Sequence, residues 1–287
     1  MTGTVVVVGD LMVDVVVVPE GPIARGSDTP SQVQSMGGGS AANTACWLAV
    51  LGTPVSLVAA VGDDELGRSA RAGLDGAGVV FAGQVEPQTA TGTCVVLIDE
   101  TGERTMLPDR GANEELSPAV VEAAIDTSAA WVHVSGYALL GTGSRPAAHA
   151  AIAAARRLGL PWSVDAASAA PLQKVGPKPF LRWIEGCTVL FANDDELDAL
   201  GGARAVLDHA AAEVVLKLGA AGASWTDGLR SESSPAVPAT VVDTIGAGDA
   251  FDAGFVTARL QGSDPAASLR SGAVAAARAV SQRGARP

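Results

Sequence analysis

Short apolar runs separated by alanine- and leucine-rich stretches are the feature that most constrains the fold of this chain. The first run, Thr4–Val8, is followed directly by Gly9 and Asp10. Buried parallel strands read as continuous apolar runs, and helices are the usual connections between them. The alternation predicts an α/β fold with a doubly wound, mostly parallel sheet. Further strand-like runs lie at 55–61, 130–134, 162–164, 189–191 and 214–218, and helix-like stretches lie at 147–158 and 203–211.

Two stretches break this alternation. Residues 13–36 and 92–107 contain strand-like segments with no helix long enough to cross between them. The sequence Asp-Glu-Thr-Gly-Glu at 99–103 indicates a tight turn, and hence a hairpin in the second stretch. We predict that the two stretches form a small separate sheet inserted in a single domain that spans residues 1–287. The stretch 231–238 reads as an ordinary surface loop.

Composition excludes several classes of function. With 287 residues, 48% of them hydrophobic, the chain can bury a sizeable core as one large domain. Its formal net charge of -12 argues against a nucleic-acid partner, because such binding depends on Lys and Arg neutralising phosphates. No apolar run reaches membrane-spanning length and the N-terminus lacks the pattern of an export signal. We therefore expect a cytoplasmic protein without a membrane partner.

The most chemically specific segment is Asp-Thr-Ile-Gly-Ala-Gly-Asp-Ala-Phe at 243–251. Gly246 and Gly248 precede an apolar, helix-like run, so their backbone amides would face an anion at a helix N-terminus. A carboxylate at Asp249 would repel a merely bound anion, but it could take a proton from a hydroxyl that attacks phosphorus. Taken alone, the segment leaves two interpretations open: phosphoryl transfer to an alcohol, or a glycine-rich turn with a capping aspartate.

A second segment, Gly-Gly-Gly-Ser-Ala-Ala-Asn-Thr-Ala at 37–45, favours the first interpretation. Small residues at a helix start let a ligand approach the backbone, and Asn43 offers both a donor and an acceptor to a polyhydroxylated molecule. Together the two segments resemble the signatures of the PfkB, or ribokinase-like, family of carbohydrate and nucleoside kinases. These signatures are a Gly-Gly-x-x-x-Asn helix start and a later Asp-Thr-x-Gly-Ala-Gly-Asp run. The resemblance covers essentially the whole chain.

The resemblance implies a role for each matching residue. The implied catalytic base is Asp249, with an anion hole formed by Gly246, Ala247 and Gly248. The implied sugar-binding residues are Asp14, Gly38, Gly39 and Asn43. The implied nucleotide-side residues are Asn193, Lys217, Gly219, Gly222, Gly246 and Gly248. The small sheet would be the lid over the substrate and the interface of a homodimer.

The implied cofactors are ATP and Mg²⁺, with K⁺ as a further candidate. Asn193 and Glu196 match an Asn-x-x-Glu element that the family associates with the Mg²⁺–phosphate network. Asp243 and Ile245 match a loop that binds a monovalent cation in many members. Ile245 replaces a threonine there, which removes a hydroxyl but keeps the backbone carbonyl. Modest stimulation by potassium is therefore expected.

The resemblance implies an ATP-dependent kinase that phosphorylates a primary hydroxyl of a small ribose-, fructose- or keto-sugar-like acceptor. A nucleoside kinase is the alternative, with adenosine or pseudouridine as examples of the acceptor. Aromatic residues make up only 4% of the chain, which favours a free sugar because a base needs an apolar or aromatic slot. A catalytically dead, nucleotide-binding regulatory protein is a third hypothesis, against which the intact Asp249 argues.

Overall fold

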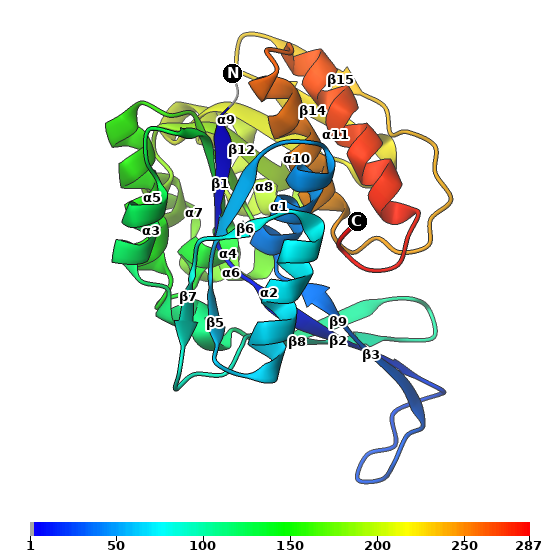
Figure 1. Cartoon of the computed structure of the whole chain (residues 1–287). Coiled ribbons are helices and arrows are strands. Elements are labelled where there is room, and N and C mark those ends of the chain that lie inside the picture. The colour runs from blue at the N-terminus through cyan, green and yellow to red at the C-terminus, as the bar shows by residue number, and fades with distance from the viewer. Residues whose placement is uncertain (1–2) are drawn as a thin grey trace.

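The computed structural model describes residues 3–287, and within them a nine-stranded sheet forms the centre of the molecule (Figure 1). The strand order is β15-β14-β13-β12-β11-β10-β1-β4-β6. The strands from β13 to β6 pair in parallel, whereas β14 pairs antiparallel with both β13 and β15. The strands are β1 (Thr4–Val8), β4 (Val55–Val58), β6 (Val80–Phe81), β10 (Ala129–Ser135), β11 (Trp162–Asp165), β12 (Cys187–Asn193), β13 (Ala211–Lys217), β14 (Ala223–Thr226) and β15 (Ser231–Ser234). The predicted doubly wound α/β fold is confirmed.

Helices cover both faces of this sheet (Figure 1). One face carries α1 (Ser40–Val50), α2 (Glu65–Ala77), α10 (Ala247–Leu260) and α11 (Pro265–Val280). The other carries α3 (Pro118–Ala124), α4 (Gly136–Leu140), α5 (Arg145–Leu158), α6 (Ala169–Val175), α7 (Pro177–Trp183), α8 (Asp194–Ala199) and α9 (Gly202–His209). Val5 and Val7 of β1 pack toward α1 and α10, whereas Val6 and Val8 pack toward α5. Both faces are buried, which is why the strand is apolar at every position.

A separate four-stranded sheet projects from the main body (Figure 1). Its order is β3-β2-β8-β9, and β2 pairs with β8 in parallel while the two outer pairs are antiparallel. The strands are β2 (Met12–Pro19), β3 (Ser31–Gly38), β8 (Thr93–Ile98) and β9 (Arg104–Asp109). The two stretches that broke the α/β alternation thus form the small sheet predicted for them.

The sequence-based prediction was wrong in two places. The run 55–61 is divided into β4 and β5 (Ala60–Gly62), and β5 leaves the main sheet to pair with β7 (Gln84–Glu86). The stretch 231–238 begins with the edge strand β15, which its serine-rich sequence did not indicate. Two short 3-10 helices, η1 (Gly111–Glu115) and η2 (Gly219–Ala221), complete the elements. None of the helices within residues 3–287 combines the length and apolarity needed to span a bilayer.

Polar residues collect where the parallel strands end. Asp10 follows β1, Asp165 ends β11, Asn193 ends β12 and Lys217 ends β13. The carboxyl ends of parallel strands share one edge of a sheet, and ligands of open α/β folds bind outside that edge. The N-termini of α1 and α10 reach the same region, because Ser40 of α1 is hydrogen-bonded to Asp249 of α10.

Candidate active site

Two glycines allow the chain to turn into the helices that form the site. Gly39 precedes α1 with φ 94°, and a Cβ at this position would lie 2.6 Å from the carbonyl oxygen of Asp10. Gly246 precedes α10 with φ 74°, and a Cβ there would lie 2.6 Å from the carbonyl oxygen of Ala285. Both positions combine left-handed backbone with close approach of another segment, so only glycine fits. The glycines of both motifs therefore place the two helix starts next to each other.

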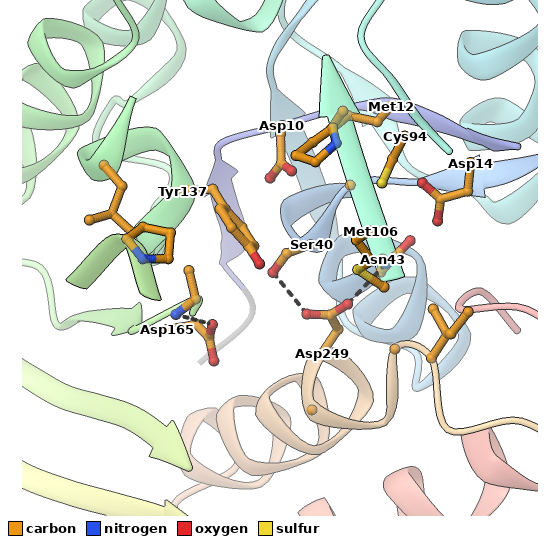
Figure 2. A pocket seen from close by; sticks show the side chains of 18 of the residues that line it. Asp10, Met12, Asp14, Ser40, Asn43, Cys94, Met106, Tyr137, Asp165 and Asp249 are labelled. Carbon is orange, nitrogen blue, oxygen red and sulfur yellow. Dashed lines mark hydrogen bonds between the residues drawn. The ribbon is translucent and has the colours of Figure 1, made fainter. Parts of the chain in front are cut away.

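Asp249 is held between these helix starts (Figure 2). One carboxylate oxygen accepts a hydrogen bond from Ser40 Oγ at 2.8 Å, and the other accepts one from Asn43 Nδ2 at 2.9 Å. Gly246 is the N-cap of α10 and no side chain caps that helix start. The two side-chain hydrogen bonds of Asp249 come from α1, which the capping-turn interpretation does not explain.

Burial raises the pKa of Asp249 to about 7, and the nearby charge of Asp165 acts in the same direction. The hydrogen bonds from Asn43 and Ser40 oppose this rise because they stabilise the carboxylate. A carboxylate with a pKa near neutrality is a much stronger base than an ordinary aspartate. An aspartate with this pKa can take up a proton near pH 7.

The raised pKa predicts an acid limb in the pH dependence of activity. A base must be unprotonated to accept a proton, so kcat/KM for the acceptor should fall by about tenfold per pH unit below about pH 7. Above that pH the base is fully ionised, and its contribution should level off. Initial rates measured between pH 5 and 9, with Mg²⁺ and ATP saturating, would test this. A profile that is flat across pH 7 would exclude Asp249 as the titrating base.

A buried charge network lies beside the anion-hole segment. Lys217 Nζ lies 2.5 Å from an oxygen of Asp165 and 3.2 Å from an oxygen of Asp252. A Cβ at Gly248 would be 3.3 Å from the same nitrogen, which places the ammonium group next to the start of α10. Burial disfavours the charged forms of Asp165 and Asp252. The attraction to Lys217 nevertheless keeps the pKa of Asp165 below its ordinary value. For Asp252 the effect of burial is larger than that attraction, and its pKa is raised. Lys217 is therefore a cation held at the predicted anion hole.

Asn193 and Glu196 form a reciprocal helix cap at the start of α8. Glu196 N–H donates to Asn193 Oδ1 at 2.9 Å, and Asn193 N–H donates to Glu196 Oε2 at 2.9 Å. Both side chains also line the cavity described below. Mg²⁺ in kinase sites binds through one or two protein oxygens, substrate phosphates and water. Each side-chain oxygen of the pair already accepts one hydrogen bond within it, so the carboxylate and the amide fit such a site through their remaining lone pairs or through bound water.

The sugar-side residues predicted from the sequence lie near one another. Asp14 of β2 faces Gly38 of β3, where a Cβ would lie 2.1 Å from Asp14 Oδ1, so the carboxylate occupies the space that a side chain would fill. Burial raises the pKa of Asp14 to about 6, with Arg286 opposing the rise and Asp10 adding to it. Asn43 lines the same cavity, and its amide also binds Asp249 on one side and Arg286 on the other.

Arg286 is a site residue that sequence reasoning missed. Its Nε donates to Asn43 Oδ1 at 3.2 Å and its Nη2 donates to the carbonyl oxygen of Gly38 at 2.6 Å. The adjacent carbonyl of Ala285 accepts a hydrogen bond from Trp47 Nε1 at 2.9 Å, which fixes this segment under α1. With a cationic donor at Oδ1, the amide of Asn43 must present Nδ2 to Asp249. No motif marks an isolated arginine 243 residues from its partner.

Replacing Arg286 with alanine should therefore lower kcat by about tenfold, which is the worth of one charge-assisted hydrogen bond. Without the arginine, Asn43 would be free to turn its amide, and Asp249 would lose a stabilising donor. The acid limb of the pH profile should then move to higher pH, a shift that a purely structural loss would not produce. Arg283→Ala is the matched control, since Arg283 is exposed. An unchanged acid limb would show that Arg286 does not orient Asn43.

An arginine binds two side chains of the candidate cation loop. Asp243 Oδ1 pairs with Arg104 Nη2 at 2.8 Å and accepts from Ile245 N–H at 3.0 Å, while Oδ2 accepts from Gly284 N–H at 3.0 Å. Thr244 Oγ1 also accepts a hydrogen bond from Arg104. Arg104 belongs to β9, so this ion pair joins the small sheet to the glycine-rich loop. A potassium ion would find the oxygens of Asp243 already bound to donors.

Two cavities meet at the start of α10. The first, about 740 Å³, contains the polar groups and is lined by Asp10, Asp14, Gly39, Asn43, Tyr137, Glu196 and Asp249, among others. The second, about 660 Å³, is mainly apolar and is lined by Gly222, Ala236, Val237, Pro238, Ala239, Val241, Phe251, Ala273, Ala276 and Val280, among others. Lys217, Gly219, Thr244 and Gly248 line both. The anion-hole segment thus separates a chamber that contains most of the charged side chains, called the polar chamber below, from the apolar chamber.

Known proteins share this architecture along the full length of the chain. Residues 2–287 match the pfkB family carbohydrate kinase model, and the chain belongs to this family. It is 34% identical over 250 residues to an ATP-dependent ribose-1-phosphate kinase of Halopiger xanaduensis, covering 85% of this chain and 80% of that protein. It is 28% identical over 270 residues to a ribokinase of Bacillus subtilis, covering 92% and 88% of the two chains.

Solved structures agree with this assignment. The Arabidopsis thaliana ribokinase complexed with ribose and ATP superposes with a TM-score of 0.81 at 26% identity, covering 99% of this chain and 95% of that one. A ribokinase-like Escherichia coli protein, solved in complex with ATP and Mg²⁺, has the same fold with a TM-score of 0.86, at 23% identity and coverages of 99% and 94%. The chain is thus a carbohydrate kinase of this family.

Proposed function

We propose that the protein transfers the terminal phosphoryl group of ATP to a primary hydroxyl of a small sugar, with Asp249 as the general base. The observation that carries the proposal is the position of the Asp249 carboxylate in the polar chamber, at the N-terminus of α10 and next to Gly248, which lines both chambers. An attacking hydroxyl in the polar chamber would lie within reach of this carboxylate. The phosphoryl group would lie against the amides of Gly246, Ala247 and Gly248.

The polar chamber is the proposed acceptor site. The carboxylate of Asp14 would accept hydrogen bonds from ring hydroxyls, and the backbone of Gly39, which lines the same chamber, would lie beside the ring. Asn43 would act mainly by fixing Asp249. The resulting position of the hydroxyl relative to the base and to the phosphorus accounts for a large part of the rate in phosphoryl transfer. A ribose-type ring is favoured because the relatives in Halopiger xanaduensis and Bacillus subtilis are named for ribose 1-phosphate and ribose.

The apolar chamber is the proposed site of the adenine of ATP, with Gly219 and Gly222 beside it. Lys217 would stabilise the charge on the phosphates from its position next to Gly248. Asn193 and Glu196 would hold Mg²⁺, which neutralises charge on the phosphates when it is bound. Stimulation by potassium stays a prediction; an ion would have to bind through backbone carbonyls near Ile245, because Asp243 is paired with Arg104.

The four-stranded sheet is the proposed lid. Its inner face contributes Met12, Asp14, Cys94 and Met106 to the polar chamber, and Arg104 fastens it to the glycine-rich loop. Closure would exclude water, which would otherwise compete with the sugar for the phosphoryl group. Val33 and Leu107 are exposed on this sheet. We propose that they contribute to a homodimer formed through the lid.

A screen of acceptors tests the proposal. The purified chain, with ATP and Mg²⁺, would be offered pentoses, hexoses, keto-sugars, their phosphates and nucleosides, and ADP formation would be followed. We expect acceptor-dependent ADP formation with a ribose-type sugar or its phosphate. Preference for a nucleoside would support the alternative, for which Tyr137 is the aromatic ring available in the chamber. The absence of acceptor-dependent turnover across the screen would favour a regulatory protein.

A further inference from the structure

Three cationic side chains line the polar chamber, and one of them, Arg110, has a terminal nitrogen without a hydrogen-bond partner among residues 3–287. The ammonium of Lys217 is paired with Asp165 and Asp252, and the terminal nitrogens of Arg104 are bound to Asp243 and Thr244. Arg110 instead forms its ion pair through Nε, which lies 2.9 Å from Glu114 Oε1. Its Nη2 is buried and has no hydrogen-bond partner among residues 3–287. A guanidinium with unused donors is costly in a buried site, so a missing partner is indicated.

Arg110 lies at the acceptor end of the chamber. Its guanidinium carbon is 5.8 Å from the centre of the Tyr137 ring. Its carbonyl oxygen accepts from Asn113 Nδ2 at 3.0 Å, and Asn113 Oδ1 accepts from the N–H of Leu11 at 3.0 Å. Leu11 follows Asp10 directly, so these bonds fix Arg110 against the segment that carries Asp10 and Asp14. That segment is the proposed sugar site, not the nucleotide site.

Glu114 holds the arginine without occupying its terminal nitrogens. Its second oxygen, Oε2, accepts from the N–H of Gly143 at 2.7 Å, which anchors the carboxylate to the chamber wall. The arginine side chain is only 20% exposed and is confined between Glu114 and the ring of Tyr137. A guanidinium fixed in this way is ready to form paired hydrogen bonds with the oxygens of a phosphate or a carboxylate.

We propose that Arg110 binds an anionic group, a phosphate or a carboxylate, that the acceptor sugar carries away from the hydroxyl to be phosphorylated. The inference rests on the proposed function and narrows its substrates from small sugars to anionic ones. A neutral sugar could offer single hydroxyl oxygens to Arg110, but neither a negative charge nor the pair of oxygens that matches a guanidinium. An anionic acceptor also needs this positive charge, because Asp10 and Asp14 line the same chamber and would repel it.

The test compares ribose, ribose 1-phosphate and 2-dehydro-3-deoxygluconate as acceptors for the wild type and for Arg110→Gln, at saturating ATP. The phosphate-bearing and carboxylate-bearing sugars distinguish the two sources of the anion. We expect the wild type to prefer one of them over ribose. Arg110→Gln should raise the KM for that acceptor by about 10- to 100-fold, as expected for loss of charge-assisted hydrogen bonds. The KM values for ribose and ATP should change by less than about twofold.

Two further variants serve as controls, Arg110→Lys and Arg204→Gln. Lysine keeps the charge but not the paired geometry, so it should give an intermediate KM for the anionic acceptor. Arg204 forms the same kind of ion pair through Nε, with Asp208 at 2.8 Å on an exposed helix face, and its loss should leave all KM values unchanged. A wild type that prefers ribose, or an Arg110→Gln variant that keeps the wild-type preference, would overturn the inference while leaving the kinase proposal standing. No acceptor-dependent turnover with any sugar would overturn both.

Discussion

Replacing Asp249 with asparagine should lower kcat by about 10² to 10⁴, the usual contribution of a positioned general base. Asparagine keeps the size of the side chain and can still bond to Ser40 and Asn43, but it cannot take the proton of the attacking hydroxyl. The loss should appear with every true acceptor and should leave the KM for ATP nearly unchanged. Steady-state kinetics of the variant and the wild type would measure it.

The same substitution should not destabilise the fold near neutral pH. The pKa of Asp249 is raised above its ordinary value of 3.8 to about 7. The carboxyl group therefore favours the fold at pH values below 3.8, and this contribution is lost as the pH rises through 7. At pH 8 the buried carboxylate is ionised and destabilises the fold, whereas asparagine is neutral. The melting temperature of Asp249→Asn should therefore be equal to or higher than that of the wild type. Asp264→Asn, at the N-cap of α11, is the control, since it alters an aspartate at a helix start outside the chambers. Near-normal turnover of Asp249→Asn would indicate that the segment 243–251 has a structural role and that Asp249 is not the general base.

Replacing Lys217 with alanine should cost about 3 to 5 kcal/mol of the free energy of unfolding, in addition to lowering activity. The substitution leaves the carboxylate of Asp165 buried without its counter-ion, and Asp252, which is fully buried, loses its cationic neighbour. Urea unfolding at pH 8, followed by circular dichroism, would measure the loss. Lys174→Ala is the matched control, because Lys174 is an exposed lysine of α6.

The pH dependence of this loss supplies a second check. Attraction to Lys217 holds the pKa of Asp165 below its ordinary value, so the pair stabilises the fold above that value and the contribution fades as the pH falls. The difference in unfolding free energy between the wild type and Lys217→Ala should therefore become smaller at acidic pH. A loss of unfolding free energy below about 1 kcal/mol at pH 8 would show that Lys217 and Asp165 are not a strongly interacting buried ion pair.

The architecture could be predicted from the sequence where an element is long and buried on both faces. Thr4–Val8 is apolar at every position because helices cover both sides of the sheet, and that pattern is visible without coordinates. Strands of two or three residues, such as β5, β6 and β7, are too short to show a period. The apolar chamber was missed for a related reason: residues 236–241 and one side of α11 line it together, and neither has a motif.

The candidate site was predictable only where the backbone constrains the sequence. Gly39 and Gly246 mark turns that other residues cannot make, and Asn43 and Asp249 follow them at short spacing. Arg104, Arg110 and Arg286 come from distant parts of the chain and act through single side chains. An isolated arginine on a strand or near the end of a chain has no periodicity and needs no special backbone. Its role becomes visible only when its partner is identified.

In the proposed reaction, the oxygen of a primary sugar hydroxyl attacks the terminal phosphorus of ATP, ADP leaves, and the phosphoryl group ends on that oxygen. Proton-coupled phosphorus NMR of the product tests it most directly. The purified chain would be incubated with ATP, Mg²⁺ and the preferred acceptor of the screen, and ADP would be quantified in the same sample. We expect one ADP for each new phosphoester, with its phosphorus signal split by the methylene protons of the primary carbon. ADP released together with inorganic phosphate alone, or a phosphoester on a secondary hydroxyl, would contradict the account.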